Sequence, residues 1–176
     1  MDTKSTLNTK SENRIIHYAM AVFLVLIGVV IDQFTKHLAV IHLKDQEPYV
    51  ILKDIFELHY LENRGAAFGL FQNQQIFFII SVLIISGVAI WFYAKVPMER
   101  RFLPLRFCAV MIMAGAFGNC IDRVSQSYVV DFFYFKLIDF PIFNVADIYV
   151  TVATFFVVFL LFFYYKEEEI ERIFHR

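Results

Sequence analysis

Residues 146–165 read ADIYVTVATFFVVFLLFFYY, and this stretch decides the fold because no charged side chain follows Asp147 within it. A helix of about 20 residues rises roughly 30 Å, which matches the hydrocarbon core of a bilayer. Lipid offers no hydrogen-bond partners to an exposed backbone, so a segment of this kind has to be helical. We therefore predict a membrane span at residues 146–165 that begins beside a carboxylate, Asp147.

Three further apolar stretches have the length of a membrane span. They lie at about residues 15–34, 76–94 and 102–121. Basic residues precede the first stretch, but no small-residue cleavage site follows it, so we expect it to be retained as a span. The whole chain is 59% hydrophobic, whereas soluble domains average about 45–50%. The sequence predicts an all-α integral membrane protein with four transmembrane helices and a single domain, residues 1–176.

The distribution of Lys and Arg predicts the orientation of these spans. Ten of them would lie on the side of the N-terminus and six on the other side, where the loops are longer. The positive-inside rule then places both termini in the cytoplasm. On the outer side, the loop of about residues 36–75 contains Tyr49–Leu52 and Ile55–Leu61, whose β-branched and aromatic residues predict a small β element on the outer membrane face. The acidic tail after Lys166 is expected to continue the last span as a solvated helix.

Polar residues gather where the spans reach the outer face, and ionisable groups at such a depth are functional candidates. These residues are Asp32 at the end of the first span, Asn119, Asp122 and Arg123 at the end of the third, and Asn144 and Asp147 at the start of the fourth. Asp131 lies in the connection between the last two spans, among Val and Phe. Desolvation in such surroundings disfavours the charged form of a carboxylate.

Each of these residues also has a purely structural interpretation. Asn144 and Asp147 form the kind of pair that caps a helix N-terminus. Asp122 and Arg123 could form a local ion pair on one helix face, and Asp32 could mark the water boundary. Asp131 is the residue that such interpretations explain least well.

Two neighbouring carboxylates can act as an acid–base pair, since like charges at short range cannot both ionise. One member then activates water and the other polarises a peptide carbonyl. The histidines are scattered without a His-Glu-x-x-His run, so we expect no metal and no cofactor. The serines lack a neighbouring base, and a net charge of −1 leaves no basic surface for nucleic acid.

Five sequence blocks, in this order, resemble those of the lipoprotein signal peptidases, also called type II signal peptidases. They are Asp32-Gln33-Phe34-Thr35-Lys36, Asn63-Arg64-Gly65-Ala66-Ala67-Phe68, Gly118-Asn119-Cys120-Ile121-Asp122-Arg123, Val129-Val130-Asp131-Phe132 and Phe143-Asn144-Val145-Ala146-Asp147. The resemblance implies that Asp131 and Asp147 are the catalytic pair. It also implies dyad-supporting or substrate-binding roles for the matching residues Asp32, Lys36, Asn63, Gly65, Asn119, Asp122, Arg123 and Asn144.

The same resemblance implies a substrate and a location. The substrate is a prolipoprotein whose lipobox cysteine carries diacylglycerol, and the enzyme cuts before that cysteine to release the signal peptide. The location is the bacterial inner membrane, with the active site at the periplasmic face, contact with membrane lipids and a monomeric chain. The alternative is a small transporter or proton-relay protein that uses the carboxylates, but such sites tend to lie near the bilayer midplane.

Overall fold

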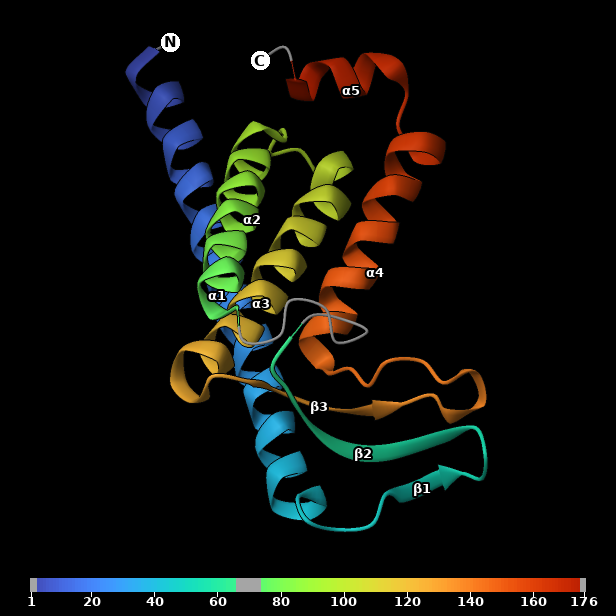
Figure 1. The fold of residues 1–176 in the computed structure, drawn as a ribbon. Helices are drawn as coiled ribbons and strands as arrows, with labels where there is room; N and C mark the ends of the chain where they lie inside the picture. The colour runs from blue at the N-terminus through green and yellow to red at the C-terminus, as the bar shows by residue number, and fades with distance from the viewer. Residues whose placement is uncertain (1–2, 66–73, 175–176) are drawn as a thin grey trace.

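The computed structural model describes residues 3–65 and 74–174, with side chains from residue 14 onward. Four helices in it are long and apolar enough to cross a membrane, as the sequence predicts. They are α1 (Thr3–Leu43), α2 (Gln75–Lys95), α3 (Leu103–Gln126) and α4 (Val145–Phe159), the last extended by a π-helical turn, η4 (Leu160–Tyr164). The four helices stand side by side as a bundle, with a small sheet beyond one end (Figure 1).

Two helices run further than the apolar stretches that predicted them. Helix α1 continues past residue 34 to Leu43, and α3 continues past residue 121 to Gln126. Ala39 and Leu43 are buried against Val130 and Phe132, so the extra turns of α1 pack on the protein instead of on lipid. A hydropathy pattern marks the bilayer thickness, whereas tertiary packing sets where these helices end.

Helix α3 is the centre of the bundle. It packs against α1, α2 and α4, and more than half of its span is buried, whereas the other three spans mostly face outward. Two glycines of α3 permit close contact with neighbouring elements. A Cβ on Gly115 would lie 2.4 Å from the carbonyl oxygen of Ala146, and one on Gly118 would lie 2.5 Å from Oδ2 of Asp32.

The sheet has three antiparallel strands in the order β1–β2–β3: β1 (Tyr49–Leu52), β2 (Phe56–Asn63) and β3 (Val129–Tyr134). The first two strands were predicted at nearly these positions. The third was predicted only as a connection, because its first four residues are all buried and show no alternation. Strand β3 pairs with β2 with Asn63 opposite Val129 and Leu61 opposite Asp131.

The acidic tail does not extend the last span. Helix α5 (Glu167–Phe174) folds back across the end of the bundle opposite the sheet (Figure 1). Its Ile173 is fully buried, and Glu169 accepts a hydrogen bond from Nε of Arg101 at 2.9 Å. The expectation of a solvated extension was wrong because apolar residues alternate with the glutamates at helical spacing.

The close contact at Gly115 should be sensitive to a single methyl group. We expect Gly115→Ala to lower the free energy of unfolding by about 1–3 kcal/mol, since the methyl would overlap the α4 backbone. A Cβ added to Gly87, in the middle of α2, would meet none of the described atoms within 4 Å apart from the neighbouring backbone of its own helix. Gly87→Ala should therefore be neutral or stabilising, by up to about 1 kcal/mol. Unfolding in detergent micelles compares the two variants, and equal effects would contradict the close contact.

Candidate functional site

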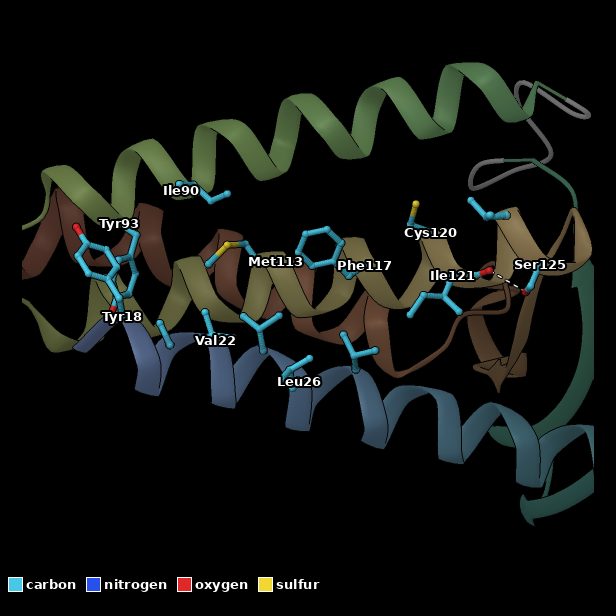
Figure 2. A pocket seen from close by; sticks show the side chains of 14 residues that line it. Tyr18, Val22, Leu26, Ile90, Tyr93, Met113, Phe117, Cys120, Ile121 and Ser125 are labelled. Atoms are coloured by element: carbon cyan, nitrogen blue, oxygen red, sulfur yellow. Dashed lines mark hydrogen bonds between the residues drawn. The ribbon is translucent and has the colours of Figure 1, made fainter. Parts of the chain in front are cut away.

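Within the part of the chain that the structure describes, one large cavity lies between helices and another lies between helices and the sheet, and only the second is lined by carboxylates. The cavity of about 810 Å³ lies between α1, α2 and α3 (Figure 2). Its lining is aliphatic and aromatic, with Tyr18 and Tyr93 at one end and Ser125 at the other. The Ser125 hydroxyl already donates to the carbonyl of Ile121 at 2.7 Å. Among the described residues, no carboxylate, histidine or lysine lines this cavity.

The cavity of about 990 Å³ contains both Asp131 and Asp147 in its lining. Strand β3 supplies Asp131 and the first turn of α4 supplies Asp147. Asn63, Gly65 and Arg123 also line this cavity. Asp131 and Asp147, from separate elements, thus share one cleft at the sheet end of the bundle, and Glu62 and Asp139 also belong to its lining.

Asp131 is almost fully buried, with 1% of its surface exposed. Its Oδ2 accepts a hydrogen bond from Nδ2 of Asn63 at 2.8 Å, and its Oδ1 accepts one from Nδ2 of Asn144 at 2.6 Å. Burial, and after it the nearby charge of Asp147, raise the pKa of Asp131 to about 7, against the opposing effect of the Asn63 and Asn144 hydrogen bonds. Asp131 therefore exchanges its proton near neutral pH.

Asp147 belongs to a capping box as well as to the cavity. Its backbone N–H donates to Oδ1 of Asn144 at 3.0 Å, and its Oδ2 accepts from the Asn144 N–H at 3.1 Å. Its other oxygen, Oδ1, accepts from Nδ2 of Asn119 at 2.8 Å. The capping interpretation of this pair is confirmed, but the same contacts also aim Asp147 toward the cavity. Capping and a functional role are not alternatives here.

Three asparagines present their NH₂ groups to the two carboxylates because their oxygens are already occupied. Oδ1 of Asn63 accepts from the Gly65 N–H, and Oδ1 of Asn144 accepts from the Asp147 N–H. Oδ1 of Asn119 accepts from both Lys36 and Asn144. If an amide were flipped, its oxygen would face a carboxylate oxygen and its NH₂ group would face another hydrogen-bond donor. The orientation of each amide follows from these contacts.

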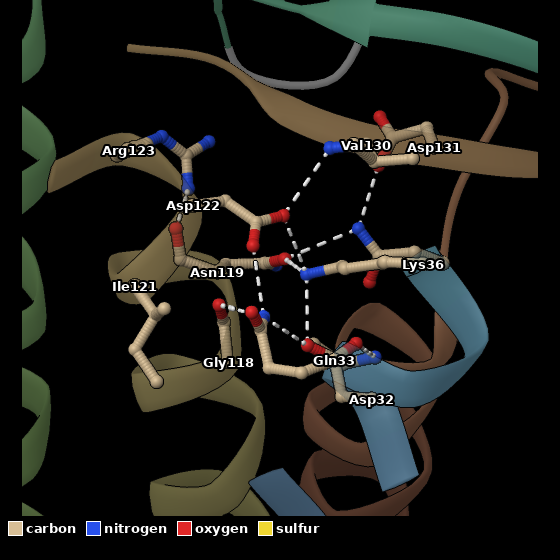
Figure 3. A network of polar contacts seen from close by, with 12 residues as sticks. Asp32, Gln33, Lys36, Gly118, Asn119, Ile121, Asp122, Arg123, Val130 and Asp131 are labelled. Atoms are coloured by element: carbon tan, nitrogen blue, oxygen red, sulfur yellow. Dashed lines mark hydrogen bonds and ion pairs between the residues drawn. The ribbon is translucent and has the colours of Figure 1, made fainter. Parts of the chain in front are cut away.

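Lys36 is a buried cation in contact with Asn119, one of the three asparagines (Figure 3). Its Nζ lies 2.8 Å from Oδ2 of Asp32 and 3.0 Å from Oδ2 of Asp122, and it donates to Oδ1 of Asn119 at 2.8 Å. Asp32 in turn accepts the Ala146 N–H at the start of α4, at 2.9 Å. One ammonium group therefore connects α1, α3 and the first turn of α4.

Arg123 does not form the local ion pair that the sequence allowed. Asp122 pairs with Lys36, while Nη2 of Arg123 donates to the Gly65 carbonyl at 3.1 Å. The guanidinium also lies over the ring of Phe78, 4.1 Å from its centroid. Arg123 thereby connects α3 to the β2 end and to α2.

The structure separates the sequence-predicted residues into two groups. One group lines the cavity: Asp131, Asp147, Asn63, Gly65 and Arg123. The other lies behind it: Asn119, Asn144, Asp32, Lys36 and Asp122. Three residues of the second motif block, Ala66, Ala67 and Phe68, lie outside the described residues. Sequence reasoning missed Gln33, whose place beside Asp32 in the motif was the available signal.

The fold and the site together define an integral membrane protein whose ionisable groups converge at the end of its bundle. The family model described as Signal peptidase (SPase) II matches residues 24–163. The chain belongs to this family of signal peptidases.

Curated relatives and solved structures agree with the family. A protein named lipoprotein signal peptidase from Caldanaerobacter subterraneus subsp. tengcongensis is 44% identical over 76% of this chain and 89% of its own length. One of the same name from Clostridium tetani is 38% identical over 79% of this chain and 90% of its own length. A solved bacterial membrane enzyme superimposes with a TM-score of 0.71 at 28% identity, covering 81% of this chain and 87% of its own.

Loss of the Lys36 charge should destabilise the protein strongly. Lys36→Met would leave Asp32 and Asp122 buried without their cation, which costs about 3–5 kcal/mol in comparable buried pairs. The double variant Lys36→Met/Asp122→Asn removes one of the orphaned charges and should recover part of the loss. Unfolding in detergent measures both. A single variant as stable as the parent would contradict the ion network.

Proposed function

We propose that this protein is an aspartic endopeptidase that removes signal peptides from lipoproteins, with Asp131 and Asp147 as the catalytic dyad. The observation that carries the proposal is the pair of carboxylates in one cavity, one of them buried with a pKa of about 7. Such a pair can hold one proton between its members at neutral pH, which is the state that metal-free peptide hydrolysis needs.

The environments of the two carboxylates suggest their roles. Asp131 is the more deeply buried, so we assign it the proton and the task of donating to the scissile carbonyl oxygen. Asp147 takes a proton from water, whose hydroxyl adds to the carbonyl carbon. As the C–N bond breaks, the leaving nitrogen takes the proton from Asp147, and Asp131 regains its own as the carbonyl reforms.

The cavity also suits a lipid-bearing substrate. Beside the carboxylates its lining becomes apolar, with Phe78 from α2 and Ile148 and Val152 from α4. An acyl chain could lie between these helices while the peptide bond rests at the carboxylates. This supports a prolipoprotein whose cysteine carries diacylglycerol, cut on the N-terminal side of that cysteine. The relatives named lipoprotein signal peptidase support the same substrate.

We further propose that the protein lies in the bacterial inner membrane as a monomer, with its termini in the cytoplasm and its site at the periplasmic face. The start of α1 and helix α5 lie at the same end of the bundle, away from the sheet, which supports a common side for both termini (Figure 1). The excess of Lys and Arg at that end supports the cytoplasm as that side. A transporter is not favoured, because the carboxylates gather at the end of the bundle and the chain belongs to a peptidase family.

Asp131→Asn and Asp147→Asn should each abolish cleavage of a diacylglyceryl-modified prolipoprotein by the purified protein in detergent. We expect losses of at least about 10³-fold, because each substitution removes a proton-transfer group. Asp54→Asn is the matched control, since Asp54 is exposed in the β1–β2 turn with φ 58°, a conformation that Asn accepts. Near-normal turnover by either variant would show that the substituted aspartate is not catalytic. Separately, if the parent protein cleaves the unlipidated precursor as fast as the lipidated one, the lipid is not required.

The pH dependence should reflect the proton on Asp131. With a pKa raised to about 7, Asp131 is protonated below neutral pH and loses its proton as the pH rises. If Asp131 is the acid, kcat should fall about tenfold per pH unit well above this value. Single-turnover rates measured from about pH 5 to pH 9, with the enzyme in saturating excess over the substrate, test this. A rate that rises across the same range would assign Asp131 as the base.

A further inference from the structure

Gln33 bridges the carboxylates of Asp32 and Asp122, although it belongs neither to the proposed dyad nor to the supporting residues that the sequence predicted. Nε2 of Gln33 lies 2.8 Å from Oδ1 of Asp122, 3.1 Å from the Gly118 carbonyl and 3.2 Å from Oδ2 of Asp32 (Figure 3). The amide of Gln33, which lies ten residues before the end of α1, thus joins α1 to the last turns of α3. An amide suits this place because it supplies donors to two carboxylates without adding charge.

The Asp122 carboxylate that Gln33 holds is also the anchor of strand β3. Its Oδ2 accepts the backbone N–H of Val130 at 3.2 Å, and this contact is buried. Val130 immediately precedes Asp131 in the strand. Apolar packing of Val130 and Phe132 on α1 sets the depth of β3, but packing of this kind is not directional. Pairing with β2 sets the register of β3, and the hydrogen bond to Asp122 adds a directional contact from α3 at the residue next to Asp131.

We infer that Gln33 is a positioning residue for the hydrolysis, acting through Asp122 and the Val130 N–H to place Asp131 against Asn63 and Asn144. This inference rests on the proposed function, because it concerns the placement of one member of the dyad. Lys36 also reaches Asp122, but on the oxygen that Val130 uses. Gln33 holds the other oxygen, so it fixes the rotation of the carboxylate plane that Lys36 alone leaves free.

Gln33→Leu tests the inference, since leucine is similar in size and lacks the donors. We expect kcat for the lipidated precursor to fall about tenfold while KM stays within about twofold, because placement and not substrate binding is lost. Hydrogen–deuterium exchange at the Val130 amide should become faster by a similar factor. Gln33→Asn, which keeps the amide but is one methylene too short, should act in the same direction and serves if the leucine variant does not fold. Gln46→Leu, at an exposed position after α1, is the matched control and should leave all three quantities unchanged.

Two results would overturn the inference. One is an unchanged kcat in both folded Gln33 variants, and the other is a reduced kcat with unaltered exchange at Val130. Measuring Asp131→Asn in the same assay separates the test of the Gln33 role from the test of the proposed function. Wild-type turnover by a Gln33 variant beside an inactive Asp131→Asn rejects only the positioning role, whereas an active Asp131→Asn rejects the dyad itself.

Discussion

The direction of three asparagine side chains is the constraint on which the site depends. Two carboxylates in one cavity repel each other, and no cation among the described residues lies within ion-pair distance of either. Amide NH₂ groups from Asn63, Asn119 and Asn144 hold them instead. A neutral donor steadies a carboxylate while leaving burial as the dominant influence on its pKa. The proposed dyad can therefore be fixed in space without being forced to ionise.

These three amides come from different elements, so they reach the two carboxylates only if the helix bundle and the sheet are packed in one defined arrangement. Asn119 belongs to α3, Asn63 ends β2 and Asn144 caps α4. The small residues of α3 make this meeting possible, since Gly115 allows the α4 backbone to approach and Gly118 admits the Asp32 carboxylate. Asp32 then accepts the Ala146 N–H in the first turn of α4. Close packing in the membrane thus fixes the geometry at its edge.

Sequence reasoning found the features that depend on local pattern. The spans follow from bilayer thickness, and the unusual setting of Asp131 follows from its immediate neighbours in Tyr128–Phe133. Features that depend on contacts between distant segments were missed. The fully buried β3 shows no alternation, the partner of Asp122 is a lysine 86 residues earlier in the chain, and α5 returns across the bundle. The motif match named Lys36 as a supporting residue but could not say that it acts through Asn119.

The position of Lys36 explains how a cation can orient the pair of carboxylates, Asp131 and Asp147, without forming an ion pair with either. An ammonium in direct contact with Asp131 would stabilise the ionised carboxylate and lower its pKa. Lys36 instead donates to Oδ1 of Asn119, and the opposite end of that amide faces Asp147. Its own charge is compensated by Asp32 and Asp122, and it lowers the pKa of Asp131 less than the hydrogen bonds from Asn63 and Asn144 do. Lys36 therefore orients the Asn119 amide, and the amide orients Asp147, without an ammonium group touching either carboxylate of the cavity. The carboxylates can thus have a fixed geometry while the pKa of Asp131 stays near neutral.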